Sequence, residues 1–202
     1  MTEIFCFIVP KKTKIEVGGK MKLKIWAKTF FSIYRCLSSL AKSIDNYVEI
    51  RANSCFHSTL SRLTLCQTER VFNDITTLIN KKINLINIKA LTEKLLLNLP
   101  EKYARFLVLK YIDGLTFEKT AECLGFTSRT AMRWNISVLN RCSNILRSWG
   151  YTNEKLLDFV GREHWIVNLF NKLLIEENQH STKIAFFVLI NEAEKEYKKY
   201  MI

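Results

Sequence analysis

Apolar residues recur at alternating steps of three and four positions through the first quarter of this chain. The row consists of Leu23, Trp26, Phe30, Ile33, Leu37, Leu40, Ile44 and Tyr47. Steps of this kind place every member on one face of a single long α-helix. A coiled-coil seam has the same spacing. Large aromatic side chains are poor seam residues, however, so we expect the row to pack inside the chain's own domain.

Residues that interrupt helices are rare in the whole sequence. Only two of the 202 residues are proline and six are glycine, whereas 48% are apolar. Proline and glycine have the lowest helix propensities, and an apolar fraction of this size is enough to build a core. The sequence therefore predicts an all-α protein, folded as a multi-helix bundle.

Four segments are predicted along the chain. Residues 1–20 form an N-terminal extension that ends in a Gly-Gly-Lys break, and Met21 after it is an alternative start of the protein. Residues 21–97 form a helical domain, and residues 98–150 form a second unit, described below. Residues 151–202 form a C-terminal helical segment with two helices, the first beginning after Thr152 and the second near Ser181.

The helical domain over residues 21–97 is predicted to contain three helices. A polar stretch over 51–61 reads as a loop after the first helix, and Asn84 and Asn87 loosen the chain before a last helix over 88–97. The middle helix begins at about Thr68. Its packing stripe is predicted to consist of Val71, Phe72, Ile75, Leu78, Ile79, Ile83 and Ile86.

Residues 114–136 have the layout of two helices joined by a tight turn. Gly125 can adopt the left-handed conformation that such a turn needs, and Ala121 is small enough for the helices to cross closely. Hydroxyl side chains are favoured N-caps, and those of Thr116 and Thr127 are placed to cap helices over 117–124 and 128–148. The segment therefore predicts a helix-turn-helix.

The second helix of this unit divides into an apolar face and a basic face. Between Cys123 and Asn153 the sequence has four arginines and no acid. A helix N-terminus adds unpaired amides and a partial positive charge, so cations there suit a phosphate-lined groove. The alternative is a solvated face that Glu118 and Glu122 neutralise. The outward residues are Ser128, Arg129, Met132, Arg133 and Ser137.

The stretch LPEKYARFLVLKYIDGLTFEKTAECLGFTSRTAMRW resembles region four of bacterial sigma factors. The resemblance is limited to residues 98–150, and it implies a helix-turn-helix that contacts an upstream promoter element. Residues 21–98 lack the aromatic-rich helix with which sigma factors melt promoters, so the resemblance favours a regulator built on a sigma-like domain. The matching residues are Leu99, Pro100, Tyr111, Asp113, Gly114, Thr116, Ala121, Leu124, Gly125, Thr127 and Thr130.

We therefore expect a sequence-specific regulator of transcription that places this helix in the major groove of double-stranded DNA. The net charge of +12, concentrated before residue 151, favours such an anionic partner. One module of this kind binds weakly, so either RNA polymerase or a second copy of the chain, paired through its helical segments, is also expected. The residues expected to face bases are Ser128, Arg129, Met132 and Arg133, with Ser137 beside them, and those expected to hold phosphates are Lys119, Thr127 and Arg141.

A protein-binding adaptor is the alternative function. It would use the same helices against RNA polymerase or a regulatory partner, without reading DNA. Exposed aromatic side chains would favour this role, but core packing is the expectation for Trp26, Phe30, Trp149 and Trp165.

No catalytic residue, metal ligand or cofactor site is predicted. His57, His164 and His180 lie in different segments without a nearby nucleophile, and the six cysteines form no CxxC pair. The cysteines are expected to be small buried hydrophobes in their reduced form, which suits a cytoplasmic protein. No apolar run approaches the length of a membrane span, so no membrane partner is expected.

Overall fold

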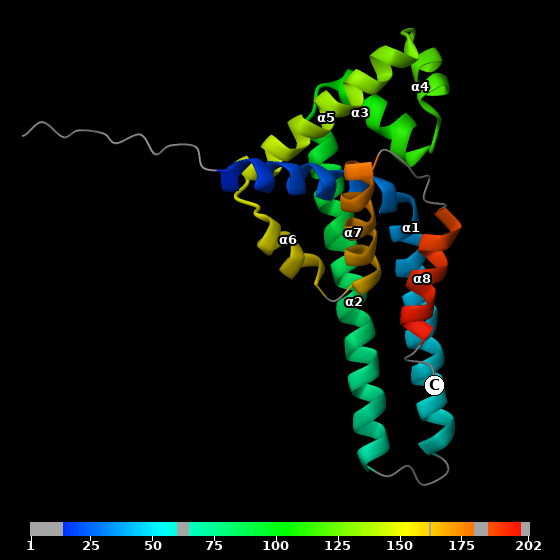
Figure 1. Cartoon of the computed structure of the whole chain (residues 1–202). Helices are drawn as coiled ribbons and strands as arrows, with labels where there is room; N and C mark the ends of the chain where they lie inside the picture. Colours follow the sequence, from blue (N-terminus) through cyan, green and yellow to red (C-terminus); the bar gives the residue numbers. More distant parts are fainter. Residues whose placement is uncertain (1–13, 60–64, 162, 180–185, 199–202) are drawn as a thin grey trace, which may run out of the picture.

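The computed structural model describes residues 14–59, 65–161, 163–179 and 186–198 (Figure 1). These residues form eight α-helices and one π-helical turn and contain no β-strand, which confirms the all-α fold class. The elements are α1 (Lys14–Thr59), α2 (Leu65–Leu97), α3 (Glu101–Leu107), the π-helical turn η1 (Val108–Ile112), α4 (Phe117–Leu124), α5 (Ser128–Ser148), α6 (Asn153–Val160), α7 (His164–Gln179) and α8 (Phe186–Lys198).

Two long helices form the framework of the molecule. α1 and α2 pack against each other, and Figure 1 shows them side by side over most of the length of α2. Asp45 pairs with Lys82 at 2.6 Å, and Arg51, farther along α1, pairs with Asp74, which lies earlier in α2, at 2.9 Å. The two helices are therefore antiparallel.

The apolar row of α1 lies in the core, as predicted. Every member from Leu23 to Ile44 is buried, and Tyr47 at its end is half-buried against the core. The Trp26 ring stacks on Phe170 of α7, with ring centroids 4.1 Å apart, and its indole Nε1 donates a hydrogen bond to Asn153 Oδ1 at 3.1 Å. The row is therefore a packing face and not a seam between two chains.

One buried cluster runs through the predicted segments 21–97, 98–150 and 151–202. It contains Leu40 of α1, Leu95 of α2, Val138 of α5 and Trp165 of α7. The boundaries at 97 and 150 stay a prediction, but the segments on either side of each boundary share this core. Of the predicted extension over 1–20, residues 14–20 belong to α1, and residues 1–13 lie outside the described residues.

Three predicted interruptions of helices are wrong. The predicted Gly-Gly-Lys break lies within α1. Residues 51–59 of the predicted 51–61 loop also belong to α1. α2 continues through Asn84 and Asn87 without a break. Intrinsic helix propensities differ by less than about 1 kcal/mol for residues other than proline, and packing of one helix on another outweighs them. The Arg51–Asp74 ion pair belongs to the packing that holds this part of α1 as a helix.

The first predicted C-terminal helix is in fact two helices. α6 ends at Val160 and α7 begins at His164. A Cβ atom at Gly161 would lie 2.8 Å from the Leu157 carbonyl oxygen, so the chain can change direction here because this residue is glycine. The second helix, α8, begins at Phe186, and Ser181 lies outside the described residues.

The predicted packing stripe of α2 is also largely wrong. Of its members only Leu78 is buried, while Val71 and Ile75 are half-buried and the other four are exposed. The face that packs on the rest of the molecule consists of Leu78, Leu85, Ile88, Leu91 and Leu95. The exposed members are Phe72, Ile79, Ile83 and Ile86.

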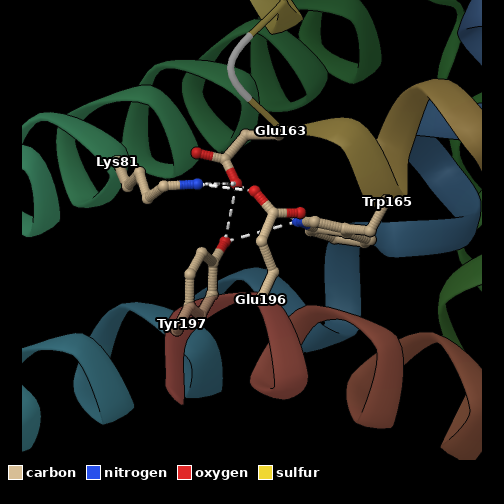
Figure 2. Close-up of polar contacts among 5 residues, drawn as sticks. All are labelled: Lys81, Glu163, Trp165, Glu196 and Tyr197. Carbon is tan, nitrogen blue, oxygen red and sulfur yellow. Dashed lines mark hydrogen bonds and ion pairs between the residues drawn. The ribbon is translucent and has the colours of Figure 1, made fainter. Parts of the chain in front are cut away.

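A buried polar cluster fastens the last two helices to α2 (Figure 2). Lys81 Nζ of α2 lies 2.6 Å from Glu196 Oε1 of α8 and 3.9 Å from Glu163 Oε2, which comes just before α7. Glu163 Oε2 also accepts hydrogen bonds from the Tyr197 hydroxyl at 2.9 Å and from Trp165 Nε1 at 3.2 Å. Burying an ionised group is costly, and the ion pairs and hydrogen bonds of this cluster offset part of that cost.

Burial changes the acidity of two members of this cluster. It raises the pKa of Glu163, and Lys81 opposes that rise because its positive charge favours the carboxylate. Glu163 Oε1 has no hydrogen-bond partner among the described residues. Burial raises the pKa of Tyr197 as well, so the phenol stays protonated and acts as a donor.

Candidate nucleic-acid interface

The turn between α4 and α5 has the predicted geometry. Gly125 adopts φ 74° and ψ 32°, in the left-handed region. The Phe126 amide donates to the Ala121 carbonyl at 3.0 Å and the Gly125 amide donates to the Glu122 carbonyl at 3.2 Å, which is a Schellman end for α4. Nothing lies within 4 Å of a Cβ built at Gly125, so backbone conformation alone favours glycine there.

Both predicted N-caps are confirmed. The Thr116 side chain accepts a hydrogen bond from the Lys119 amide at 3.3 Å, and the Thr127 side chain accepts one from the Thr130 amide at 3.4 Å. The two caps set the first residues of α4 and α5. The backbone amides in the first turn of α5 that Thr127 does not satisfy lie at the exposed end of the helix.

Trp134 anchors α5 to the elements before it. Its ring makes an edge contact with Tyr103 of α3, with centroids 5.1 Å apart, and a tilted contact with Phe126 of the turn at 4.8 Å. The Tyr111 hydroxyl of η1 donates to Asn135 Oδ1 at 2.8 Å. These contacts set the direction in which α5 leaves the turn.

One face of the second half of α5 is buried, and the first half projects. Val138, Leu139, Cys142 and Leu146 are almost fully buried, and α5 packs on α1. Figure 1 shows α4 and the start of α5 at one end of the molecule, opposite the end where α2 begins. The first turns of α5 are therefore open to a large ligand.

The two arginines at the head of α5 are exposed. Among the residues that the structure describes, neither Arg129 nor Arg133 forms an ion pair, and neither is joined to Glu118 or Glu122. The alternative of a basic face neutralised by these two acids therefore has no support in the described contacts. Two unpaired cations stand on a projecting helix end that also carries a partial positive charge.

The other predicted residues of this surface lie on the same unit. Met132 is 49% exposed, Ser137 is exposed and Ser128 is half-buried at the first position of α5. Thr127 and Lys119 are exposed on the turn and on α4. Arg141 is exposed too, but its guanidinium lies 6.0 Å from the centre of the Tyr103 ring, which restricts its reach.

Ile136 is a member of this surface that the sequence analysis missed. It is 54% exposed, one turn beyond Met132 on the projecting half of α5. The spacing of four residues from Met132 was a usable signal, since residues four apart lie on one helix face. Isoleucine side chains on a helix with an apolar face are usually buried, so the residue type alone does not indicate that Ile136 is exposed.

A cluster of metal ligands is absent from the described residues. They hold no group of three or more histidine, cysteine or acidic side chains that could bind a metal ion. Burial raises the pKa of the Cys36 and Cys142 thiols to about 12, as expected for buried cysteines, whereas Cys123 is exposed. The remaining cysteine side chains lie outside the described residues.

Within the described ranges, no helix has both the length and the apolar character needed to cross a membrane. Comparison of the chain with models of known families, with curated proteins and with solved structures gives no match.

Proposed function

We propose that the chain is a sequence-specific DNA-binding regulator of transcription, with a sigma-like helix-turn-helix formed by α4 and α5. In this proposal the first half of α5 enters the major groove. The observation that carries the proposal is the pair of exposed, unpaired arginines, Arg129 and Arg133, at the capped and projecting head of α5. Guanidinium groups in such a position can contact guanine edges in bidentate fashion.

The remaining side chains have roles that follow from their chemistry. Met132 and Ile136 offer exposed apolar surface on the projecting half of α5, which suits the methyl group of thymine. Ser128 and Ser137 can donate or accept hydrogen bonds at base edges or phosphates. Lys119, Thr127 and Arg141 border the projecting half of α5 and would hold the phosphate backbone, which sets the register of the complex but carries little sequence information.

A selected duplex tests this assignment. Duplexes enriched from a random pool by the full chain serve as the probe in a gel-shift titration. The Arg133→Ala variant is expected to lose about 1–3 kcal/mol of binding free energy if Arg133 contacts a base. Arg147→Ala is the matched control, because Arg147 is exposed in the last turn of the same helix and should leave the affinity nearly unchanged. Equal affinities of Arg133→Ala and the wild type would remove Arg133 from the interface.

A protein-binding adaptor for RNA polymerase is the second candidate. The exposed apolar side chains of Met132 and Ile136 favour it, since protein interfaces also use such residues. The dependence of binding on salt concentration distinguishes the two functions. DNA affinity that falls steeply with salt concentration supports the first, because phosphate contacts release counterions. Salt-insensitive capture of purified polymerase, with no DNA affinity, would support the second.

A further inference from the structure

α2 carries a second apolar face that nothing in the described chain covers. Phe72 is 68% exposed, and Ile79, Ile83 and Ile86 are 43–48% exposed. Ala90 and Leu97, which continue the same spacing, are exposed as well. We call these six residues the outer row of α2. A row of large apolar side chains in solvent is typical of an interaction surface.

The outer row lies on the opposite side of α2 from its packing face. At about 100° per residue, the packing face of Leu78, Leu85, Ile88, Leu91 and Leu95 centres on a direction about 180° around the helix axis from the outer row. The row's members recur at steps of three, four or seven residues, which is the spacing of a coiled-coil seam. A helix with two opposed apolar faces is suited to lie between two packing partners, and the described chain supplies only α1 and its neighbours on one side.

The charges of the residues beside the outer row indicate which kind of partner can bind there. Asn73, Asn80 and Asn87 form an exposed line of amides along one edge of it, and Lys94, whose ammonium lies 4.7 Å from the centre of the Trp149 ring, continues that line at the same spacing. On the other edge, Lys82 is paired with Asp45 at 2.6 Å, and Lys89 Nζ lies 3.0 Å from Ser38 Oγ and 4.0 Å from Glu93. A chain with net charge +12 repels its own copies in general. Apart from Glu93 and Lys94 near its Leu97 end, however, this face is apolar, and its edges consist of neutral amides and of two lysines that are paired with Asp45 and Glu93.

We infer that the outer row of α2 is a dimer interface, in which α2 pairs antiparallel with α2 of a second copy. We align the two copies so that the residues of one outer row lie opposite those of the other. Ile83 then faces the partner's Ile86, Ile79 faces the partner's Ala90, and Phe72 faces the partner's Leu97. Asn80 then lies beside the partner's Asn87. Because an amide side chain both donates and accepts hydrogen bonds, the asparagine line is complementary to itself across a two-fold axis.

The pairing places two α1–α2 pairs back to back, in the order α1, α2, α2 of the second copy and α1 of the second copy. Antiparallel helices with short-step apolar seams pack in this way. The interface uses none of the residues proposed to contact DNA, so it forms without DNA and does not depend on the proposed function. It would give one particle two copies of α5.

The mass of the full-length protein in solution tests the inference. Light scattering across a range of concentrations, without DNA, is expected to give twice the chain mass of 23.7 kDa. Ile83→Glu places two unpaired carboxylates in the middle of the interface and is expected to raise the dimer dissociation constant about 100-fold or more. Ile175→Glu makes the same change at an exposed position on α7 and should remain dimeric.

Two results would overturn the inference. A wild-type protein at the mass of one chain at every concentration would mean that another segment, such as residues 1–13, or another protein covers the outer row. A dimer that persists in Ile83→Glu would place the interface elsewhere. Ile83 is already in solvent in the single chain, so circular dichroism of the variant should match that of the wild type.

A second pair of variants tests the antiparallel register. In Asn80→Lys/Asn87→Lys, the ammonium groups introduced at the two positions meet across the interface, and their repulsion should raise the dissociation constant about tenfold. In Asn80→Lys/Asn87→Glu, opposite charges meet at the same place, and the dissociation constant should fall below that of the first variant and of the wild type. Equal effects of the two double variants would contradict the antiparallel arrangement.

Discussion

Two neighbouring lysines of α2 have very different surroundings. The Lys81 side chain is 5% exposed and lies between Glu163 and Glu196, whereas the Lys82 side chain is 32% exposed and pairs with Asp45. Solvent screens the Lys82 pair, so it contributes little to stability. Lys81 compensates the fully buried carboxylate of Glu163 and the mostly buried carboxylate of Glu196. At the residue scale, attachment of the C-terminal helices to the framework therefore depends strongly on one ammonium group.

Replacement of each lysine by methionine separates these environments. Lys81→Met is expected to lower the free energy of unfolding by about 3–5 kcal/mol, because it leaves buried carboxylates without a counter-charge. Lys82→Met should cost less than about 1 kcal/mol. Urea unfolding of both variants at neutral pH measures the difference. Similar losses in the two variants would contradict the burial described for Lys81.

The raised pKa of Glu163 makes a prediction about pH. Burial is the main cause of the rise, and the groups that face this carboxyl are Lys81, Glu196, Tyr197 and Trp165. The folded chain holds the Glu163 proton more tightly than the unfolded chain does. Its contribution to stability is therefore full below the unfolded value near 4.5 and is lost as pH rises through the raised folded value.

Glu163→Gln removes this dependence and leaves Lys81 paired with Glu196. The stability of the variant minus that of the wild type is expected to increase as pH rises through that window. Urea titrations at a series of pH values, from acidic to slightly alkaline, measure it. A difference that stays constant across the series would show that Glu163 titrates as it does in the unfolded chain.

At the scale of elements, α5 followed from the sequence and α2 did not. The limits of α5, its Thr127 cap and its buried face were predictable because each depends on local chemistry that a short stretch contains. α2 has two apolar faces, and periodicity alone cannot say which of them meets α1. The prediction chose the face of Phe72 and Ile83, and the choice was wrong because the packing face depends on contacts far along the chain.

Some residues of the candidate interface could likewise be predicted from the sequence, and others could not. Arg129 and Arg133 could be placed on an exposed face from the cap and the helix period. Ile136 could be placed only by its spacing of four residues from Met132, because the residue type alone gives the same signal whether an isoleucine packs or projects. The Lys81 cluster was also beyond sequence reasoning, since its members come from α2, α8 and the start of α7, and only tertiary packing brings them together.

The left-handed conformation of Gly125 predicts how substitutions at this position change the stability of the fold. Gly125→Ala should lower the free energy of unfolding by about 1–2 kcal/mol, because a Cβ atom is disfavoured in the left-handed region. Gly125→Asn should cost less, since asparagine tolerates that conformation better. Thermal or urea unfolding compares the two variants. A stability of Gly125→Ala equal to that of the wild type would contradict the conformation described for this turn.

At the scale of the whole molecule, the basic α4–α5 end and the outer row of α2 are separate surfaces on one core. The core spans α1 to α8, so α5 is held by the same packing that holds the framework. The buried face of the second half of α5 fixes the direction of its exposed first half. A ligand as long as a DNA duplex would therefore meet a rigid surface, and little ordering of the chain would oppose binding.

If the α4–α5 end contacts the phosphates of a duplex, its affinity for DNA depends on salt concentration, and this dependence is the measurement to make. Affinity for a random-sequence duplex should fall with salt, and the logarithmic slope should become shallower by about two in Lys119→Ala/Arg141→Ala. Lys42→Ala/Lys195→Ala removes the same charge from exposed positions on α1 and α8 and should leave the slope nearly unchanged. A wild-type slope near zero, or equal slopes in the two double variants, would contradict the account.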